Sequence, residues 1–349
     1  MSGLLLDAGL APLRAHRARQ RRRVVLVTGG LAIGAGALFV LTMMIGSVRL
    51  SAVEVVMSLL RPGQDPAVDL IVRELRLPTA ITALGVGLAL GLAGPIFQRL
   101  LGNPLASPDF VGVSSGASLF AVASIILFKA SSTWVSGSAL LGALAGAALI
   151  YLLAWRDGIS GYRFVLIGIG VSELLLSIAG YLIAKANIYD AREAMTWLVG
   201  SVGQAGPGEL QTLLVALAVL VPVAVALDRP LRTLELGDDS ANALGVRVEL
   251  VRVALIAVSL VLVAFSTAAA GPLVFVALVA GPLVHRVLGP APGGLLAAAL
   301  VGAIIVLTAD LVVQHVLPIA LPTGVVTGAV GAPYLIWLLV TANREGRDA

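Results

Sequence analysis

The chain has 349 residues, of which 59% are hydrophobic and 12% are charged, and its net charge is +4. Soluble domains carry about 25% charged residues, so this composition excludes a soluble globular protein. The chain has no cysteine, which excludes disulfides and thiolate chemistry. It has 39 glycines, and small residues let helices approach closely in lipid. We therefore predict a packed bundle of membrane-spanning helices.

Residues 1–23 form a basic segment, whose run Arg14–Arg23 directly precedes the first apolar window. Arginines at such a boundary face anionic membrane lipid and anchor the topology. Nucleic-acid binding is not expected, because aromatic residues are not interleaved with these arginines. The following window is long enough to span the membrane, so we expect an anchored segment and not a cleaved signal peptide.

Apolar windows of about 20 residues, the length that crosses a bilayer, recur along the chain. They predict an all-α integral membrane protein built as a ten-helix polytopic bundle, with its membrane domain at 24–341 and a cytoplasmic tail at 342–349. The eighth window is short and interrupted by a Gly-Pro pair. The windows are 24–46, 78–100, 110–128, 134–155, 163–185, 209–228, 250–270, 273–288, 293–316 and 323–341.

The distribution of Lys and Arg predicts the orientation. When the windows alternate across the membrane, most of these residues fall on the side of the N-terminus. Cytoplasmic loops carry an excess of Lys and Arg. Both termini are therefore predicted to be cytoplasmic, which requires an even number of spans.

One long cytoplasmic stretch, 228–249, is expected to hold a short helix. The piece Asp238–Leu244 lies between Gly237 and Gly245, and Asp239 suits a helix start while Gly245 suits a stop. Such a helix is either a docking surface for a cytoplasmic partner or a solvated connector, and the residues alone leave both open.

Two long stretches lie on the predicted outer side. Residues 47–77 are too long for a simple turn. Residues 186–208 contain the apolar piece Met195–Ser201, which is too short to span. It predicts an outer-face or re-entrant helix, tolerated where protein or water covers its backbone.

The sequence lacks the motifs of an enzyme. No phosphate-binding loop is present, and Lys129 and Lys185 are the only lysines. No Ser/His/Asp set and no metal-ligand spacing appears, so we expect no enzyme activity and no directly bound cofactor. Any energy must come from a partner protein or from an ion gradient.

Two carboxylates lie inside apolar windows, Glu173 in the fifth and Asp310 toward the outer end of the ninth. A carboxylate at the centre of a span costs about 2.5–3.5 kcal/mol on insertion scales, so each needs a partner, a proton or water. A proton relay in an ion-coupled carrier is one interpretation. We expect the other for Glu173, a polar contact with Ser or Thr at the seam of the bundle.

A series of short segments follows in order: Arg76-Leu-Pro, Gly87–Gly94, Asn103–Pro108, Gly112–Ala117, Leu236–Asp239, Ala243–Val246, Ala270–Pro272, Ala309–Asp310, Leu321–Thr327 and Gly331–Pro333. Together they resemble the signature of FecCD-type permeases, the membrane subunits of ABC importers for iron-siderophore complexes, haem and cobalamin. The resemblance covers about residues 70–340, and the ten spans of that family agree with the ten windows.

The resemblance implies a bacterial cytoplasmic (inner) membrane protein that works in an assembly. Two permease subunits would pair around a central pathway, with a pair of ATPase subunits inside that use the ATP. A periplasmic or lipoprotein binding protein would dock outside. The expected cargo is a ferric-siderophore complex, with haem or cobalamin as alternatives.

The resemblance also assigns three groups of site residues. The ATPase-coupling loop would be Gly237, Asp238, Asp239, Ala243, Leu244 and Gly245. The inner gate would be Asn103, Pro104 and Leu105, faced by Gly161 and Tyr162. The binding protein would dock on Arg76 with Arg73, and near Gln314.

The sequence departs from the family pattern at the outer face. Thr79 stands where a second arginine is common, three positions after Arg76, and Arg73 can substitute for it. Gln314 replaces another outer arginine. These departures favour a non-identical second permease. An ion-coupled secondary transporter and a membrane-embedded enzyme are the competing classes, and no constellation of residues supports the enzyme.

Overall fold

The computed structural model describes residues 2–46, 48–110, 112–155, 161–289, 293–316 and 321–345. These residues fold into helices and contain no strand. The α-helices are α1 (Ser2–Met44), α2 (Ala52–Leu60), α3 (Pro66–Asp69), α4 (Leu77–Leu101), α5 (Val113–Phe128), α6 (Ser132–Ala154), α7 (Gly161–Lys185), α8 (Ile188–Val199), α9 (Pro207–Leu234), α10 (Asp238–Ala243), α11 (Val248–Ala270), α12 (Val276–Leu288), α13 (Gly294–His315) and α14 (Thr323–Glu345). The segment η1 (Leu70–Arg76) is a π-helix, and η2 (Pro108–Phe110) and η3 (Val202–Gln204) are short 3₁₀-helices.

The predicted all-α membrane bundle is confirmed, and each of the ten windows coincides with a helix. In the described residues, 7 helices are long and apolar enough to cross a membrane: α1, α4 with the turns before it, α6, α7, α9, α11 and α13. The other three windows correspond to the shorter apolar helices α5, α12 and α14. The segment 186–208 contains a short helix, α8, which begins seven residues before the apolar piece Met195–Ser201 and ends at Val199, inside it.

Several helix ends differ from the predicted windows by a few residues, and the starts of α12 and α1 are the two with a clear physical reason. The eighth was expected from residue 273, but α12 begins at Val276 because Gly271 and Phe275 both adopt left-handed conformations, each with φ of 69°. This break lets another chain segment approach, and the Ser201 amide donates to the Ala270 carbonyl oxygen at 2.7 Å. The first helix begins at Ser2, so the basic segment extends α1 to 43 residues, about 64 Å.

Helix α4 forms the centre of the bundle and packs against α9, α11, α12 and α13. Its middle is buried through small residues, because a side chain at Gly87 would overlap the backbone of Ala303 on α13. At Gly94 it would overlap the carbonyl of Ala277 on α12. The core is therefore held by direct backbone contact, as lipid-embedded helices require.

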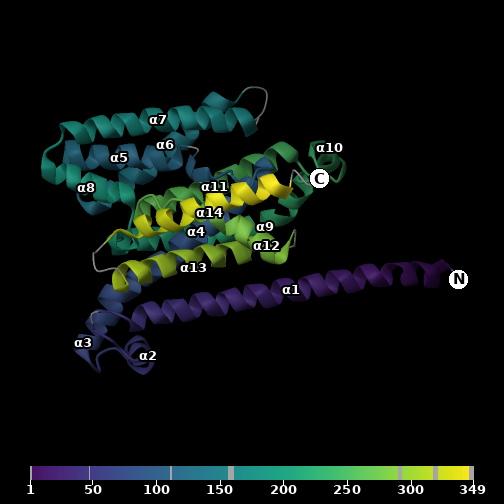
Figure 1. Cartoon of the computed structure of the whole chain (residues 1–349), viewed down its shortest axis with the longest axis horizontal. Helices are drawn as coiled ribbons and strands as arrows, with labels where there is room; N and C mark the ends of the chain where they lie inside the picture. The colour runs from purple at the N-terminus through teal and green to yellow at the C-terminus, as the bar shows by residue number, and fades with distance from the viewer. Residues whose placement is uncertain are drawn as a thin grey trace.

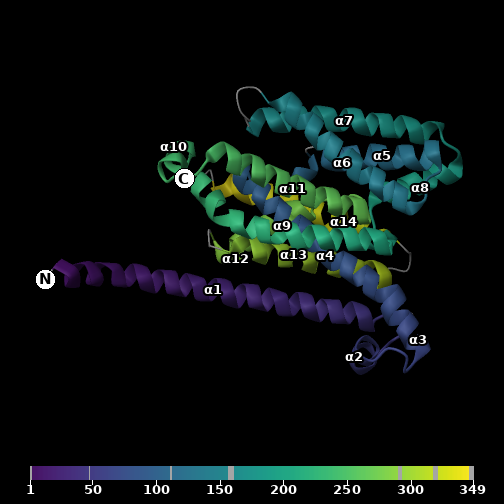
Figure 2. The ribbon, with the colours of Figure 1, turned by 180° about the vertical axis from the view of Figure 1, so that it is seen from behind.

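Helices α5, α6, α7 and α8 form a layer on one flank, and α1 lies on the other flank against α13 (Figure 1 and Figure 2). Helix α10, the start of α1 and the end of α14 lie at one end of the bundle, here called the α10 end (Figure 1). Helices α2, α3 and α8 lie at the opposite, α8 end. The first and last described residues thus lie at the same end of the bundle (Figure 1).

Candidate functional site

The short helix expected between residues 238 and 244 is present as α10. Gly237 with φ of 94° precedes it and Gly245 with φ of 84° follows it, conformations that favour glycine. Asp238 is held by Arg252 of α11, whose guanidinium donates to both carboxylate oxygens at 2.8 and 2.9 Å. Leu244 is 66% exposed. An apolar side chain on a braced, protruding helix suits contact with another protein.

A charged cluster lies beside α10 and joins α4 to α9. Arg99 of α4 donates from Nε and Nη2 to the two carboxylate oxygens of Glu235, at 2.6 and 3.3 Å. Its Nη1 donates to Asp228 of α9 at 3.1 Å. Asp228 also pairs with Arg232 at 3.2 Å and accepts from the Gly293 amide at 3.4 Å. The four side chains carry no net charge, which suits a partly buried position.

The predicted gate loop follows α4 directly. Gly102, with φ of 61°, ends the helix, and the Asn103 side chain accepts from the Leu105 amide at 2.9 Å, so the loop is an ordered turn. Asn103 and Pro104 are exposed. Tyr162 at the start of α7 is 80% exposed, and within the part of the chain that the structure describes no hydrogen bond joins it to this loop. The aromatic pair Phe97–Phe164, with ring centroids 6.1 Å apart, joins α4 to α7 instead.

Asp109, which the sequence analysis did not single out, lies farther along this loop and outside the spans. It accepts hydrogen bonds from Ser107 at 3.1 Å and from Ser114 at 3.4 Å. Burial outweighs these bonds and raises the pKa of Asp109 to about 6. The folded chain therefore holds this proton more tightly than the unfolded chain does.

We expect the substitution Asp109→Asn to stabilise the folded protein more at pH 8 than at pH 5. Above about pH 6 the folded wild type carries a buried carboxylate, so its stability falls as pH rises from about 4 to 6. A pKa raised from 3.8 to about 6 corresponds to a cost on the order of 3 kcal/mol for the buried carboxylate, which the neutral amide removes. Thermal midpoints of both proteins in detergent at the two pH values measure the difference. Identical pH profiles would exclude the cost.

At the α8 end, Arg76 was expected to be a docking residue, but its guanidinium is already engaged. It donates to the Met43 and Val48 carbonyl oxygens at 2.7 and 2.5 Å. Arg76 therefore secures the end of α1. Arg73, one turn earlier, is exposed.

The same end holds a cavity of about 390 Å³, which is lined by Arg76, Asp310, Gln314 and His315 among others. Asp310 is 4% exposed, and it accepts from the Gln314 side chain at 2.7 Å. The His315 ring lies 2.7 Å from the Ile45 carbonyl oxygen. Gln314, expected at the docking surface, thus also has a partner within the chain.

Glu173 does not lie at the bundle seam, which corrects the expectation for this residue. Its side chain is exposed on α7, and Ser177 donates to its backbone carbonyl rather than to its carboxylate. Only 11% of the central part of α7 is buried. The surface of α7 that carries Glu173 therefore faces something outside this chain.

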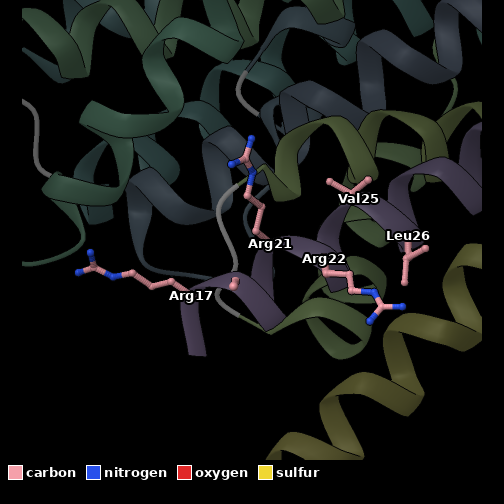
Figure 3. A pocket seen from close by; sticks show the side chains of 6 residues that line it. Arg17, Arg21, Arg22, Val25 and Leu26 are labelled. Carbon is pink, nitrogen blue, oxygen red and sulfur yellow. The ribbon is translucent and has the colours of Figure 1, made fainter. Parts of the chain in front are cut away.

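Arginine side chains project from α1 where this helix leaves the bundle at the α10 end. Arg17, Arg21 and Arg22 are exposed and point in different directions (Figure 3), and the apolar Val25 and Leu26 follow them. This change from basic to apolar side chains within two helical turns is typical of a membrane boundary.

The chain matches the model of the FecCD transport family over residues 34–341. It is 40% identical to the ferric enterobactin transport system permease protein FepG of Escherichia coli (strain K12), over 86% of this chain and 91% of that protein. It is 35% identical to the vitamin B12 import system permease protein BtuC of Shigella sonnei, over 81% of this chain and 88% of that protein. A solved inward-facing structure of a metal-chelate type ABC transporter superposes with a TM-score of 0.79 and 27% identity, covering 91% of this chain and 99% of that one.

Proposed function

The chain belongs to the FecCD transport family, and we propose that it is the membrane-spanning permease subunit of an ABC importer for ferric-siderophore complexes. The similarity to a ferric enterobactin permease along almost the whole of both chains carries this proposal. The lower identity to a vitamin B12 permease makes a corrin the second candidate cargo. ATP hydrolysis is assigned to separate ATPase subunits, because the chain has no phosphate-binding loop.

We place the α10 end in the cytoplasm of a bacterium and the α8 end outside the inner membrane. The arginines around the start of α1 support this orientation, since cytoplasmic boundaries carry the excess of basic residues. Helix α10 is then in reach of the ATPase subunits, and the binding protein docks at α2, α3 and η1. The loop at Asn103, Pro104 and Leu105 closes the inner end of the pathway.

A second permease subunit covers the exposed face of α7 in this proposal. A carboxylate facing lipid at the centre of a span costs about 2.5–3.5 kcal/mol, so Glu173 requires water or protein beside it. A pathway formed between two permeases supplies both. The departures at Thr79 and Gln314 favour a non-identical partner.

Uptake by the reconstituted importer tests the function. Proteoliposomes should contain this chain, its second permease and the ATPase subunits, with ATP inside and the iron-loaded binding protein outside. We expect accumulation of the ferric siderophore that requires both ATP and the binding protein. Uptake that persists without ATP but stops when an ionophore removes the proton gradient would instead indicate an ion-coupled carrier. Uptake of cobalamin alone would reassign the cargo.

We expect the exposed Arg73 to contribute more to docking of the binding protein than Arg76, whose guanidinium is already bonded within the chain. Arg73→Glu should weaken binding of the substrate-binding protein more than Arg73→Ala does, because reversal replaces attraction by repulsion. Loss of an exposed ion pair costs only about 0–1 kcal/mol, so the alanine variant should lose about fivefold or less. Affinity measured at low and high salt checks this, since exposed charges are screened beyond about 8 Å at physiological ionic strength.

Arg76→Ala is the matched comparison. It should lower thermal stability by freeing the end of α1, because its guanidinium bonds to two backbone carbonyls. Docking that responds to Arg76→Ala but ignores both Arg73→Glu and salt would return the contact to Arg76.

A further inference from the structure

The charged cluster of Arg99, Asp228, Arg232 and Glu235 lies between two segments that the proposed function treats separately. Arg99 precedes the gate residue Asn103 by four positions, one helical turn before the loop. Glu235 caps the C-terminus of α9 directly after Leu234, three positions before α10 begins at Asp238. A single bidentate ion pair therefore connects the gate loop to the coupling helix.

The geometry makes this connection stiff. A guanidinium bound by two parallel hydrogen bonds to a carboxylate is held in orientation as well as in distance. The third bond of Arg99, to Asp228, reaches the last turns of α9 at a second point. The side chains of Arg99 and Asp228 are 23% and 10% exposed, so water competes weakly for the bond between them, while Glu235 is 39% exposed and its pair with Arg99 relies on the bidentate geometry.

The first residue of α10 is also held by an arginine. Asp238 bonds through both oxygens to Arg252 of α11, and α11 packs against α4 in the core. Helix α10 is thus joined to α4 by two routes: through the linker Leu236-Gly237 to Glu235 and Arg99, and through Arg252 and α11. A displacement of α10 would therefore load both ion pairs.

We propose that the Arg99 cluster transmits movement of the coupling helix to the inner end of α4 and its gate loop. This inference rests on the proposed function and deepens it. Arg99 is a positioning residue: it touches no substrate, and it sets where the loop at residues 102–105 lies for a given position of α10. Glu235 is its counterpart on the coupling side.

The test uses the whole importer in proteoliposomes and measures uptake and ATP hydrolysis in the same samples. Arg99→Gln and Glu235→Gln should keep the ATPase subunits bound and hydrolysing, while uptake per ATP falls by about tenfold, within the usual range of coupling between sites. The double variant should be no worse than either single one, because both remove the same connection. Arg99→Lys should recover part of the coupling, since it keeps the charge but not the bidentate geometry.

Arg229→Gln is the matched control. It removes an arginine from the same turn of α9, where the side chain is exposed, and its uptake per ATP should equal that of the wild type. The proposal is overturned if Arg99→Gln retains wild-type uptake per ATP, or if the double variant loses the product of the two single effects. If Arg99→Gln does not fold, Glu235→Gln, whose side chain is more exposed, decides the question by its uptake per ATP hydrolysed. Failure of the proposed function would give a different result, because the wild type itself would then show no ATP-driven siderophore uptake.

Discussion

Replacing Gly237, Asp238 and Asp239 together with alanine should release the ATPase subunits while the bundle stays folded in the membrane. Gly237 has φ of 94°, and a residue with a side chain in a left-handed conformation costs about 1–2 kcal/mol. Loss of Asp238 also leaves Arg252 without its bidentate partner. The start of α10 then loses both its turn and its brace, and the surface around Leu244 is no longer presented. Co-purification of the ATPase with the tagged permease measures the loss.

Gly63→Ala provides a control for the backbone effect. Gly63 also has φ of 94° and has nothing within 4 Å of an added Cβ, as at Gly237, but it lies between α2 and α3, the helices of the α8 end. It should carry a similar strain and keep the ATPase. Full co-purification with the triple variant, at normal membrane insertion, would remove α10 from the coupling interface.

The spans and α10 could be predicted because their signals are local. Hydropathy over about 20 residues determines a span, and glycines on either side of a short polar piece predict a short helix whatever it packs against. The start of α12 lies three residues after the predicted window for the opposite reason. The break at Gly271 accommodates Gly200 and Ser201, which lie about 70 residues away in the sequence.

Side-chain partners at the two ends of the bundle were beyond reach of sequence patterns. Arg76 bonds to a carbonyl 33 residues away, and Arg99 to a carboxylate 136 residues away. From the sequence alone, these arginines indicate only the side of the membrane on which they lie. The i,i+4 spacing of Asp228 and Arg232 was the one local sign of the cluster.

Gly94→Ala should prevent stable assembly of the bundle, the largest effect expected from a single methyl group in this chain. A Cβ at Gly94 would overlap the carbonyl oxygen and carbonyl carbon of Ala277, which are backbone atoms and cannot turn aside as a side chain can. Overpacking of a core costs about 1–3 kcal/mol where side chains can adjust, and here α12 itself must move away from α4. That movement would also separate Gln98 from the Leu278 carbonyl oxygen, now 2.9 Å away.

Gly36→Ala on α1 is the comparison, because nothing lies within 4 Å of its added Cβ. In an exposed helix interior, alanine is favoured over glycine by about 1 kcal/mol, so this variant should be as stable as the wild type or more so. The fraction of protein that stays monodisperse in detergent after heating compares the two. Equal survival of Gly94→Ala and Gly36→Ala would mean that α4 and α12 are not in backbone contact. If only Gly94→Ala loses monodisperse protein on heating, the close contact between α4 and α12 is one to which the core cannot adjust.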